Sequence, residues 1–163
     1  ELEKYMAELK LTWGESAAEI KTGNPVTDVI LTQKQKEAKE TGIAFDCKYI
    51  YPVDSNINAF DVSVILNNAI ENAFEGVNGC KDPYVSVLAY RKKNAYMLEV
   101  KNCISKGVEI DKETGLPETT KKDKRSHGFG LANIRKVAQK YYGDIDINQD
   151  ENSFTLTVML MIE

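Results

Sequence analysis

The chain has 163 residues, a length that suits one domain with its own hydrophobic core. Its composition, 42% hydrophobic and 28% charged, is typical of a globular domain, and its net charge of −4 argues against nucleic acid as the main partner. The longest apolar stretches fall well short of the roughly 20 residues of a membrane-spanning helix. Three cysteines and a single histidine argue against a disulfide framework and a zinc site.

Helical spacing dominates the first forty residues. Apolar side chains recur at helical intervals over residues 1–21, and a second helix is predicted over 26–41. Asn24 is a suitable N-cap for the second helix because its side chain can accept from the first free backbone N–H groups. We expect the core side of this helix to contain three apolar residues near its start: Val26, Val29 and Ile30.

The rest of the chain predicts five strands and two more helices. The strands are expected at 43–50, 84–91, 95–103, 144–149 and 153–162, and the helices at 59–77 and 129–142. Residues 104–127 are charged and turn-rich, and a loop of this length is usually functional, a lid or disordered. This order of elements predicts an α+β fold, a two-layer sandwich with a mixed sheet and its helices on one face.

The helix at 59–77 carries a polar stripe that packing does not need. At 100° per residue, one side holds four apolar residues: Val62, Leu66, Ala69 and Ala73. The other side holds Asn68, Glu71, Asn72 and Glu75. Asparagine costs roughly half a kcal/mol relative to alanine inside a helix. The stripe therefore indicates either a functional site or a solvent-facing surface that happens to be rich in asparagine.

Two features of the chain suit magnesium and phosphate. An amide oxygen coordinates Mg²⁺ without adding charge, so Asn68 and Asn72, one turn apart, are placed to face one metal–phosphate cluster. Glu71 or Glu75 would then orient a nucleophile or a water molecule. The stretch HGFG at 127–130 precedes a helix, whose free N–H groups would cradle a phosphate unless the glycines merely end a loop.

Several stretches resemble motifs of the GHKL ATPase superfamily, the Bergerat fold shared by histidine kinases, gyrase, heat-shock protein 90 and mismatch-repair ATPases. Residues 68–76, NAIENAFEG, resemble the N-box of this superfamily. Residues 127–134, HGFGLANI, resemble its second glycine box. Two further stretches look like parts of the catalytic domain of quorum-sensing-type sensor histidine kinases: TGNPVTDVILTQK (22–34) and TTKKDKRSHGFGL (119–131). The resemblance covers about residues 22–162 and implies a Bergerat fold with ATP and Mg²⁺ as ligands.

The resemblance assigns roles by position. Asn72 matches the magnesium-binding asparagine of the family. Asn68 matches a position that is a general base in hydrolytic members and polar in kinases, so Asn68 is a second candidate metal ligand and, with Glu71, a candidate catalytic residue. Gly128 and Gly130 match glycines whose backbone meets the phosphates. The other expected ATP contacts at this end are the side chains of Lys121, Lys122 and His127, and the motif residues Phe129 and Leu131.

One position departs from the superfamily pattern. The first glycine box has Asp-x-Gly-x-Gly after a strand, and its aspartate accepts a hydrogen bond from the adenine amino group. Here Asn102 stands in the place of the aspartate and no Gly-x-Gly follows. The quorum-sensing-type kinases resemble this chain in having asparagine at this position. An asparagine oxygen also accepts a hydrogen bond, but without charge.

The resemblance also implies partners. A histidine kinase phosphorylates a histidine on a dimerisation helix, and the only histidine here is His127. The acceptor is therefore expected upstream of Glu1, with residues 1–21 as the connecting helix and 22–163 as the ATP-binding catalytic domain, its lid at about 104–127. The family further implies a response regulator and a membrane-bound, homodimeric bacterial parent with this domain in the cytoplasm.

Two alternatives remain open from the sequence. A degenerate GHKL domain would use the same scaffold to dock a partner without catalysis. The missing Asp-x-Gly-x-Gly favours this alternative, whereas the intact pair Asn68 and Asn72 and the HGFG stretch oppose it. A hydrolytic or protein-serine kinase member is the other alternative, although Asn68 stands where a hydrolase would carry glutamate.

Overall fold

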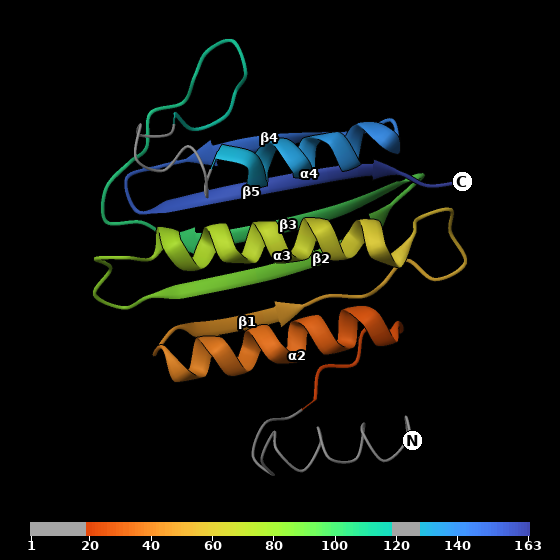
Figure 1. Ribbon diagram of the computed structural model, residues 1–163, viewed down its shortest axis with the longest axis horizontal. Coiled ribbons are helices and arrows are strands. Elements are labelled where there is room, and N and C mark those ends of the chain that lie inside the picture. The colour runs from red at the N-terminus through yellow and green to blue at the C-terminus, as the bar shows by residue number, and fades with distance from the viewer. Residues whose placement is uncertain (1–18, 119–127) are drawn as a thin grey trace.

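Within residues 19–118 and 128–163, which the computed structural model describes, five strands form one layer and three helices cover one face of it (Figure 1). The strands are β1 (Ala44–Lys48), β2 (Tyr84–Lys92), β3 (Ala95–Cys103), β4 (Asp144–Gln149) and β5 (Ser153–Met161). The helices are α2 (Pro25–Glu40), α3 (Ala59–Gly76) and α4 (Gly128–Lys140). The expected two-layer α+β sandwich is confirmed.

The sheet is mixed and follows the order β1-β2-β3-β5-β4. Strand β1 pairs in parallel with β2, and the remaining pairs are antiparallel hairpins or neighbours, with Val100 of β3 opposite Val87 of β2 and Leu156 of β5. Strand β3 is therefore central. A residue at its end is hydrogen-bonded into the sheet on both sides and is held in a fixed position below the helices.

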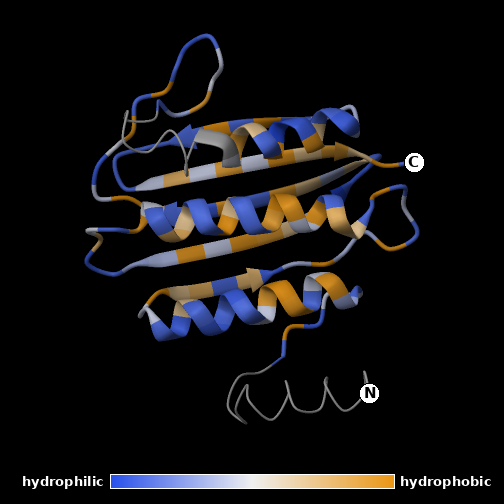
Figure 2. Ribbon diagram, in the orientation of Figure 1, coloured by the Kyte–Doolittle hydropathy of each residue, from blue (hydrophilic) through white to orange (hydrophobic). Residues whose placement is uncertain are grey.

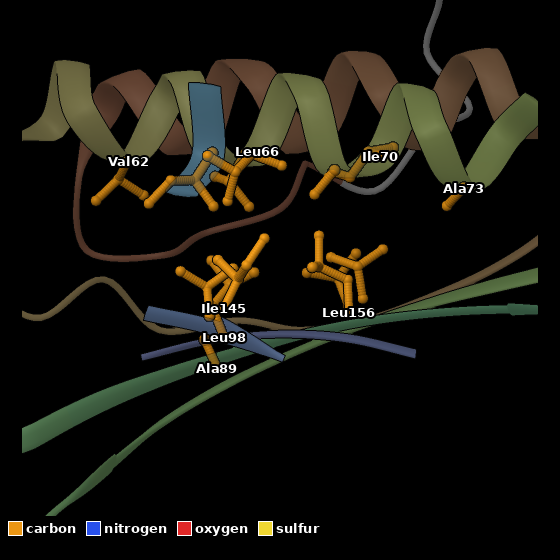
Figure 3. Close-up of a cluster of buried hydrophobic side chains, with 14 of the residues drawn as sticks. Val62, Leu66, Ile70, Ala73, Ala89, Leu98, Ile145 and Leu156 are labelled. Atoms are coloured by element: carbon orange, nitrogen blue, oxygen red, sulfur yellow. The ribbon is translucent and has the colours of Figure 1, made fainter. Parts of the chain in front are cut away.

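The core lies between α3 and the sheet. The four residues predicted as the apolar seam of α3 are at most 1% exposed: Val62, Leu66, Ala69 and Ala73. Figure 3 shows the labelled seam residues pointing at side chains of the sheet, among them Ala89, Leu98, Ile145 and Leu156. Hydrophobic and hydrophilic residues alternate around α3 in Figure 2, so the helix buries one side and leaves its asparagine stripe out of the core.

The core side of α2 matches the predicted one only in part, since Ile30 packs against the core but Val29 does not. The helix buries Thr27, Leu31, Lys34 and Ala38, whereas Val29 is 44% exposed. Thr27 is tolerated inside because its hydroxyl donates to the carbonyl of Asn24 at 3.2 Å and also pairs with the hydroxyl of Thr22. The predicted cap is confirmed, since Oδ1 of Asn24 accepts from the N–H of Val26 at 2.9 Å.

The expected connecting helix at 1–21 lies outside the described residues except for 19–21, which are not helical. None of the helices in the described part of the chain has the length and hydropathy needed to cross a bilayer.

Truncation of a side chain in the α3 seam tests how much the seam contributes to the free energy of unfolding. We expect Leu66→Ala to lower the free energy of unfolding by about 2–5 kcal/mol, because the buried side chain leaves a cavity. The matched control is Val64→Ala on the same helix, where the side chain is 38% exposed and the change should be within about 1 kcal/mol. Urea unfolding measures both, and equal losses would contradict this account of the core.

Candidate functional site

A cavity of about 800 Å³ lies at the C-terminal end of α3. It is bounded by the last turns of α3, the loop that follows it, the end of β3 and the segment after β3. The described lining residues are Thr41, Ile43, Asn72, Phe74, Glu75, Gly76, Val77, Asn78, Gly79, Pro83, Asn102, Ile104, Val108, Pro117 and Phe154. Among these, Glu75 alone carries a charge. The size is that of a small-molecule site.

Asn102 forms the inner wall of this cavity at the end of β3. Its place is fixed because it pairs with Val85 of β2 and Phe154 of β5, and it is 2% exposed. Its Nδ2 donates to the carbonyl of Cys103 at 2.9 Å. Within the described residues this is the only hydrogen bond of the side chain, which leaves Oδ1 as the acceptor available to a ligand.

Gly76 allows α3 to end directly over Asn102. A Cβ atom at Gly76 would lie 2.5 Å from Nδ2 of Asn102, closer than two such atoms can approach. Any other residue at this position would push the Asn102 amide away or shift the end of the helix. Gly76 is not among the predicted site residues, because no pattern in one sequence marks such a long-range approach.

The asparagine stripe runs from the cavity toward the start of α4. Asn72 lines the cavity. Asn68, one turn earlier, donates from Nδ2 to the carbonyl of Val64 at 2.8 Å. A Cβ atom at Gly130 would lie 3.4 Å from Oδ1 of Asn68, so the two motif-bearing helices meet at this pair. Residues more than sixty positions apart in the sequence therefore share one surface.

Glu71 lies on a different side of α3. Its Oε1 is 3.5 Å from Nζ of Lys34 on α2, its side chain is 61% exposed, and it is not among the lining residues of the cavity. Lys34 also reaches Glu37 at 3.4 Å and lies 6.0 Å from the ring centre of Phe74. The structure thus groups Asn72 and Glu75 at the cavity and turns Glu71 toward α2.

The first turn of α4 lies beside Asn68. Leu131 is 6% exposed and Ile134 is fully buried, so the core holds the start of this helix in place. The first N–H groups of a helix have no partner within it and, with the helix dipole, favour an anion. Gly128 and Phe129 are described only as backbone of α4, and the predicted contacts Lys121, Lys122 and His127 lie outside the described residues.

A polar cluster at the far end of α3 and α4 fixes their relative position. Nζ of Lys140 lies 2.8 Å from Oδ2 of Asp61, the hydroxyl of Tyr141 donates to the same oxygen, and the N–H of Asn58 donates to that hydroxyl at 3.0 Å. Partial burial opposes ionisation of Asp61, but the hydrogen bonds from Lys140 and Tyr141 outweigh it and lower its pKa. Because the cluster joins the start of α3 to the end of α4, it also holds the start of α4, at Gly130, beside Asn68 in the middle of α3.

A metal ion would find only part of its ligands here. In the described part of the chain, no three His, Cys, Asp or Glu side chains gather closely enough to hold a metal. Asn72, Asn68 and Glu75 offer oxygen atoms on neighbouring turns of one helix. This donor set fits Mg²⁺, which takes few protein ligands and completes its shell with water and phosphate oxygens.

Comparison with known proteins gives the same architecture. A family model described as a GHKL domain matches residues 57–161. The nucleotide-free catalytic domain of histidine kinase ThkA superimposes with a TM-score of 0.64 at 16% identity, covering 86% of this chain and 94% of that one. The mycobacterial sensor histidine kinase MprB superimposes with a TM-score of 0.60 at 15% identity, covering 85% of this chain and 94% of that one.

A third similar structure is the Acinetobacter baumannii histidine kinase AdeS, with a TM-score of 0.58 at 14% identity, covering 83% of this chain and 62% of that one. At these identities the likeness shows the fold. None of the curated proteins matches the sequence.

The Asp61 cluster makes a prediction about acid stability. We expect the wild type to exceed Asp61→Asn in free energy of unfolding by up to about 1 kcal/mol above about pH 4. This advantage should disappear as the pH falls through the lowered pKa of Asp61 in the folded state, because the protonated carboxyl no longer pairs with Lys140. Urea unfolding from pH 7 to pH 2.5 measures the difference in free energy of unfolding between the two proteins. A difference that does not change with pH would contradict the stabilising role of the ionised Asp61.

Proposed function

Because the chain belongs to the GHKL domain family, we propose that it is the ATP-binding catalytic domain of a sensor histidine kinase. The observation that carries the proposal is the meeting of α3 and α4 at Asn68 and Gly130, directly beside a cavity lined by Asn72 and Asn102. The N-box motif of α3 thus lines a cavity large enough for a nucleotide, and the start of α4, which carries the second motif, packs against α3 one turn away at Asn68.

The chemistry of Asn102 supports placing adenine at the inner end of the cavity. Because Nδ2 is engaged with the carbonyl of Cys103, Oδ1 is the atom that meets a ligand. An acceptor pairs with the amino group of adenine and does not pair with the oxo group of guanine. An asparagine here in place of aspartate is also the feature that supports the quorum-sensing-type subgroup as the finer family assignment.

The triphosphate would then run along α3 toward α4. Gly76 and Asn68 are eight residues apart on one helix, which corresponds to about 12 Å. This distance leaves room for the ribose and the phosphates between the adenine end and the start of α4. The first N–H groups of α4 would receive the terminal phosphates, with Gly128 and Gly130 allowing close approach.

The charge of the site supports binding of the nucleotide with magnesium. The one charged residue in the described lining, Glu75, is acidic, so a polyphosphate needs cations from elsewhere. Asn72, with Asn68 beside it, would hold Mg²⁺, which neutralises phosphate oxygens when bound. Lys121, Lys122 and His127 would add side chains at the γ-phosphate.

We propose that the γ-phosphoryl group passes from ATP to a histidine outside this chain, on an upstream dimerisation domain, and from there to a response regulator. Such transfer depends mainly on positioning and charge, which is what the residues of α3 and α4 provide. Glu71 remains a predicted catalytic residue that would have to leave Lys34 to act at the phosphates. The parent protein is proposed to be bacterial, membrane-bound and homodimeric, with this domain in the cytoplasm.

Replacement of Asn72 tests the proposed site. We expect Asn72→Ala to weaken magnesium-dependent binding of a non-hydrolysable ATP analogue by at least about tenfold, equivalent to about 1.4 kcal/mol, because one metal ligand is lost. The fold should be unchanged, since alanine is a better helix former than asparagine. Calorimetric titration with and without Mg²⁺ measures the effect.

The matched control is Asn67→Ala, which makes the same chemical change one position earlier on α3, away from the cavity lining. It should bind the analogue like the wild type. Unchanged affinity in a folded Asn72→Ala protein would refute the role of Asn72. Absence of binding by the wild type at millimolar analogue would favour the non-catalytic docking domain instead.

A further inference from the structure

Residues 108–118, within the loop that follows β3, form a defined hairpin. The N–H of Asp111 donates to the carbonyl of Leu116 at 2.8 Å, and the N–H of Glu118 donates to the carbonyl of Glu109 at 2.7 Å. At the tip, Oδ1 of Asp111 accepts from the N–H groups of Glu113 and Thr114. This segment is therefore a folded turn, although its charged sequence shows no hydropathy periodicity that would predict one.

The tip of the hairpin is attached to α4 by Arg135. Nη1 of this arginine donates to the carbonyl of Thr114 at 2.5 Å, and a Cβ atom at Gly115 would lie 3.6 Å from its Nη2. Nε lies 3.3 Å from Oδ1 of Asp144 at the start of β4, and the arginine side chain is only 25% exposed. A mostly buried guanidinium that is paired with Asp144 through charge, without a hydrogen bond at Nε, is restricted in its motion and can act as a fixed donor to the hairpin backbone.

The base of the hairpin is attached to β4 by Gln149. Its Oε1 accepts from the N–H of Val108 at 3.2 Å, and its Nε2 donates to the carbonyl of Val108 at 2.6 Å. The side-chain amide thus pairs with both backbone groups of one residue, as a neighbouring strand would. Figure 1 shows the 104–118 segment passing from the end of β3 to the side of α4 and β4.

The same hairpin supplies part of the cavity wall. Val108 and Pro117, one from each arm, line the cavity, whereas neither Arg135 nor Gln149 does. Val108 is held directly by Gln149, and Pro117 follows the turn that Arg135 holds. Leu116 adds an apolar contact with the core. Two polar side chains outside the cavity therefore determine where one of its walls lies.

We propose that Arg135 and Gln149 are positioning residues for nucleotide binding, which hold the 108–118 hairpin so that Val108 and Pro117 close one side of the cavity. This inference rests on the proposed function, since it assumes that the cavity takes the nucleotide. When either attachment is lost, the hairpin leaves the wall for part of the time, and the apparent affinity falls in proportion to the binding-competent fraction.

The test uses Arg135→Ala, Gln149→Ala and the double variant, titrated with a non-hydrolysable ATP analogue and Mg²⁺ well below the unfolding temperature. Each single variant should weaken binding about tenfold, the result of a competent fraction near one tenth. The affinity of the double variant should fall by less than the product of the two single fold-losses, because both changes release the same hairpin. A merely structural role would lower the unfolding temperature and leave these affinities unchanged.

Two matched controls accompany these variants. Arg91→Ala removes an exposed arginine of β2 next to the β2–β3 turn, and Asn148→Ala removes the exposed amide next to Gln149 on β4. Both should bind like the wild type. Hydrogen exchange without nucleotide provides an independent readout, in which the amides of Asp111 and Glu118 should exchange faster in the Arg135 and Gln149 variants than in the controls.

The two readouts separate the possible failures. Unchanged exchange at Asp111 and Glu118 would show that Arg135 and Gln149 do not hold the hairpin. Faster exchange with affinity within twofold of the wild type would show that the hairpin does not shape the binding site. Either result overturns the inference while wild-type binding stands. If the wild type itself fails to bind the analogue, the proposed function fails too, and the exchange data still report whether the hairpin is anchored.

Discussion

The packing of α3 against the sheet is the constraint on which the rest of the molecule depends. Its apolar seam, which includes Val62 and Leu66, is fully buried against the sheet, so the rotation of the helix about its axis is fixed. Once the seam faces the sheet, Asn68 and Asn72 must lie outside the core, and α4 must pack beside Asn68. The position of the candidate site therefore follows from the packing of the core.

The position of the cavity follows from how α3 and β3 end. The helix stops at Gly76 directly over Asn102, where the absent side chain allows an approach that any Cβ atom would prevent. The central strand holds Asn102 from both sides, while its Nδ2 is engaged with Cys103. An acceptor atom with a fixed direction thus lies at the inner end of the cavity, and the start of α4 lies beside Asn68, one turn of α3 before the cavity residue Asn72.

Local patterns predicted the elements because helix and strand periodicities are local. They also placed the seam of α3 correctly, but hydropathy alone put Val29 on the core side of α2, where a hydrogen-bonded Thr27 is buried instead. The motifs identified Asn68 and Gly130 without showing that they touch. The attachments made by Arg135 and Gln149 join residues 21 and 41 positions apart, and such contacts leave no periodic trace in one sequence.

The most direct test of the central claim, that this cavity binds ATP with Mg²⁺, is a crystal structure of the chain with a non-hydrolysable ATP analogue and Mg²⁺. We expect the adenine amino group at Oδ1 of Asn102, the metal at the side-chain oxygen of Asn72, and the γ-phosphate at the first turn of α4. An analogue bound in the opposite direction, or outside the cavity at the end of α3, would contradict it.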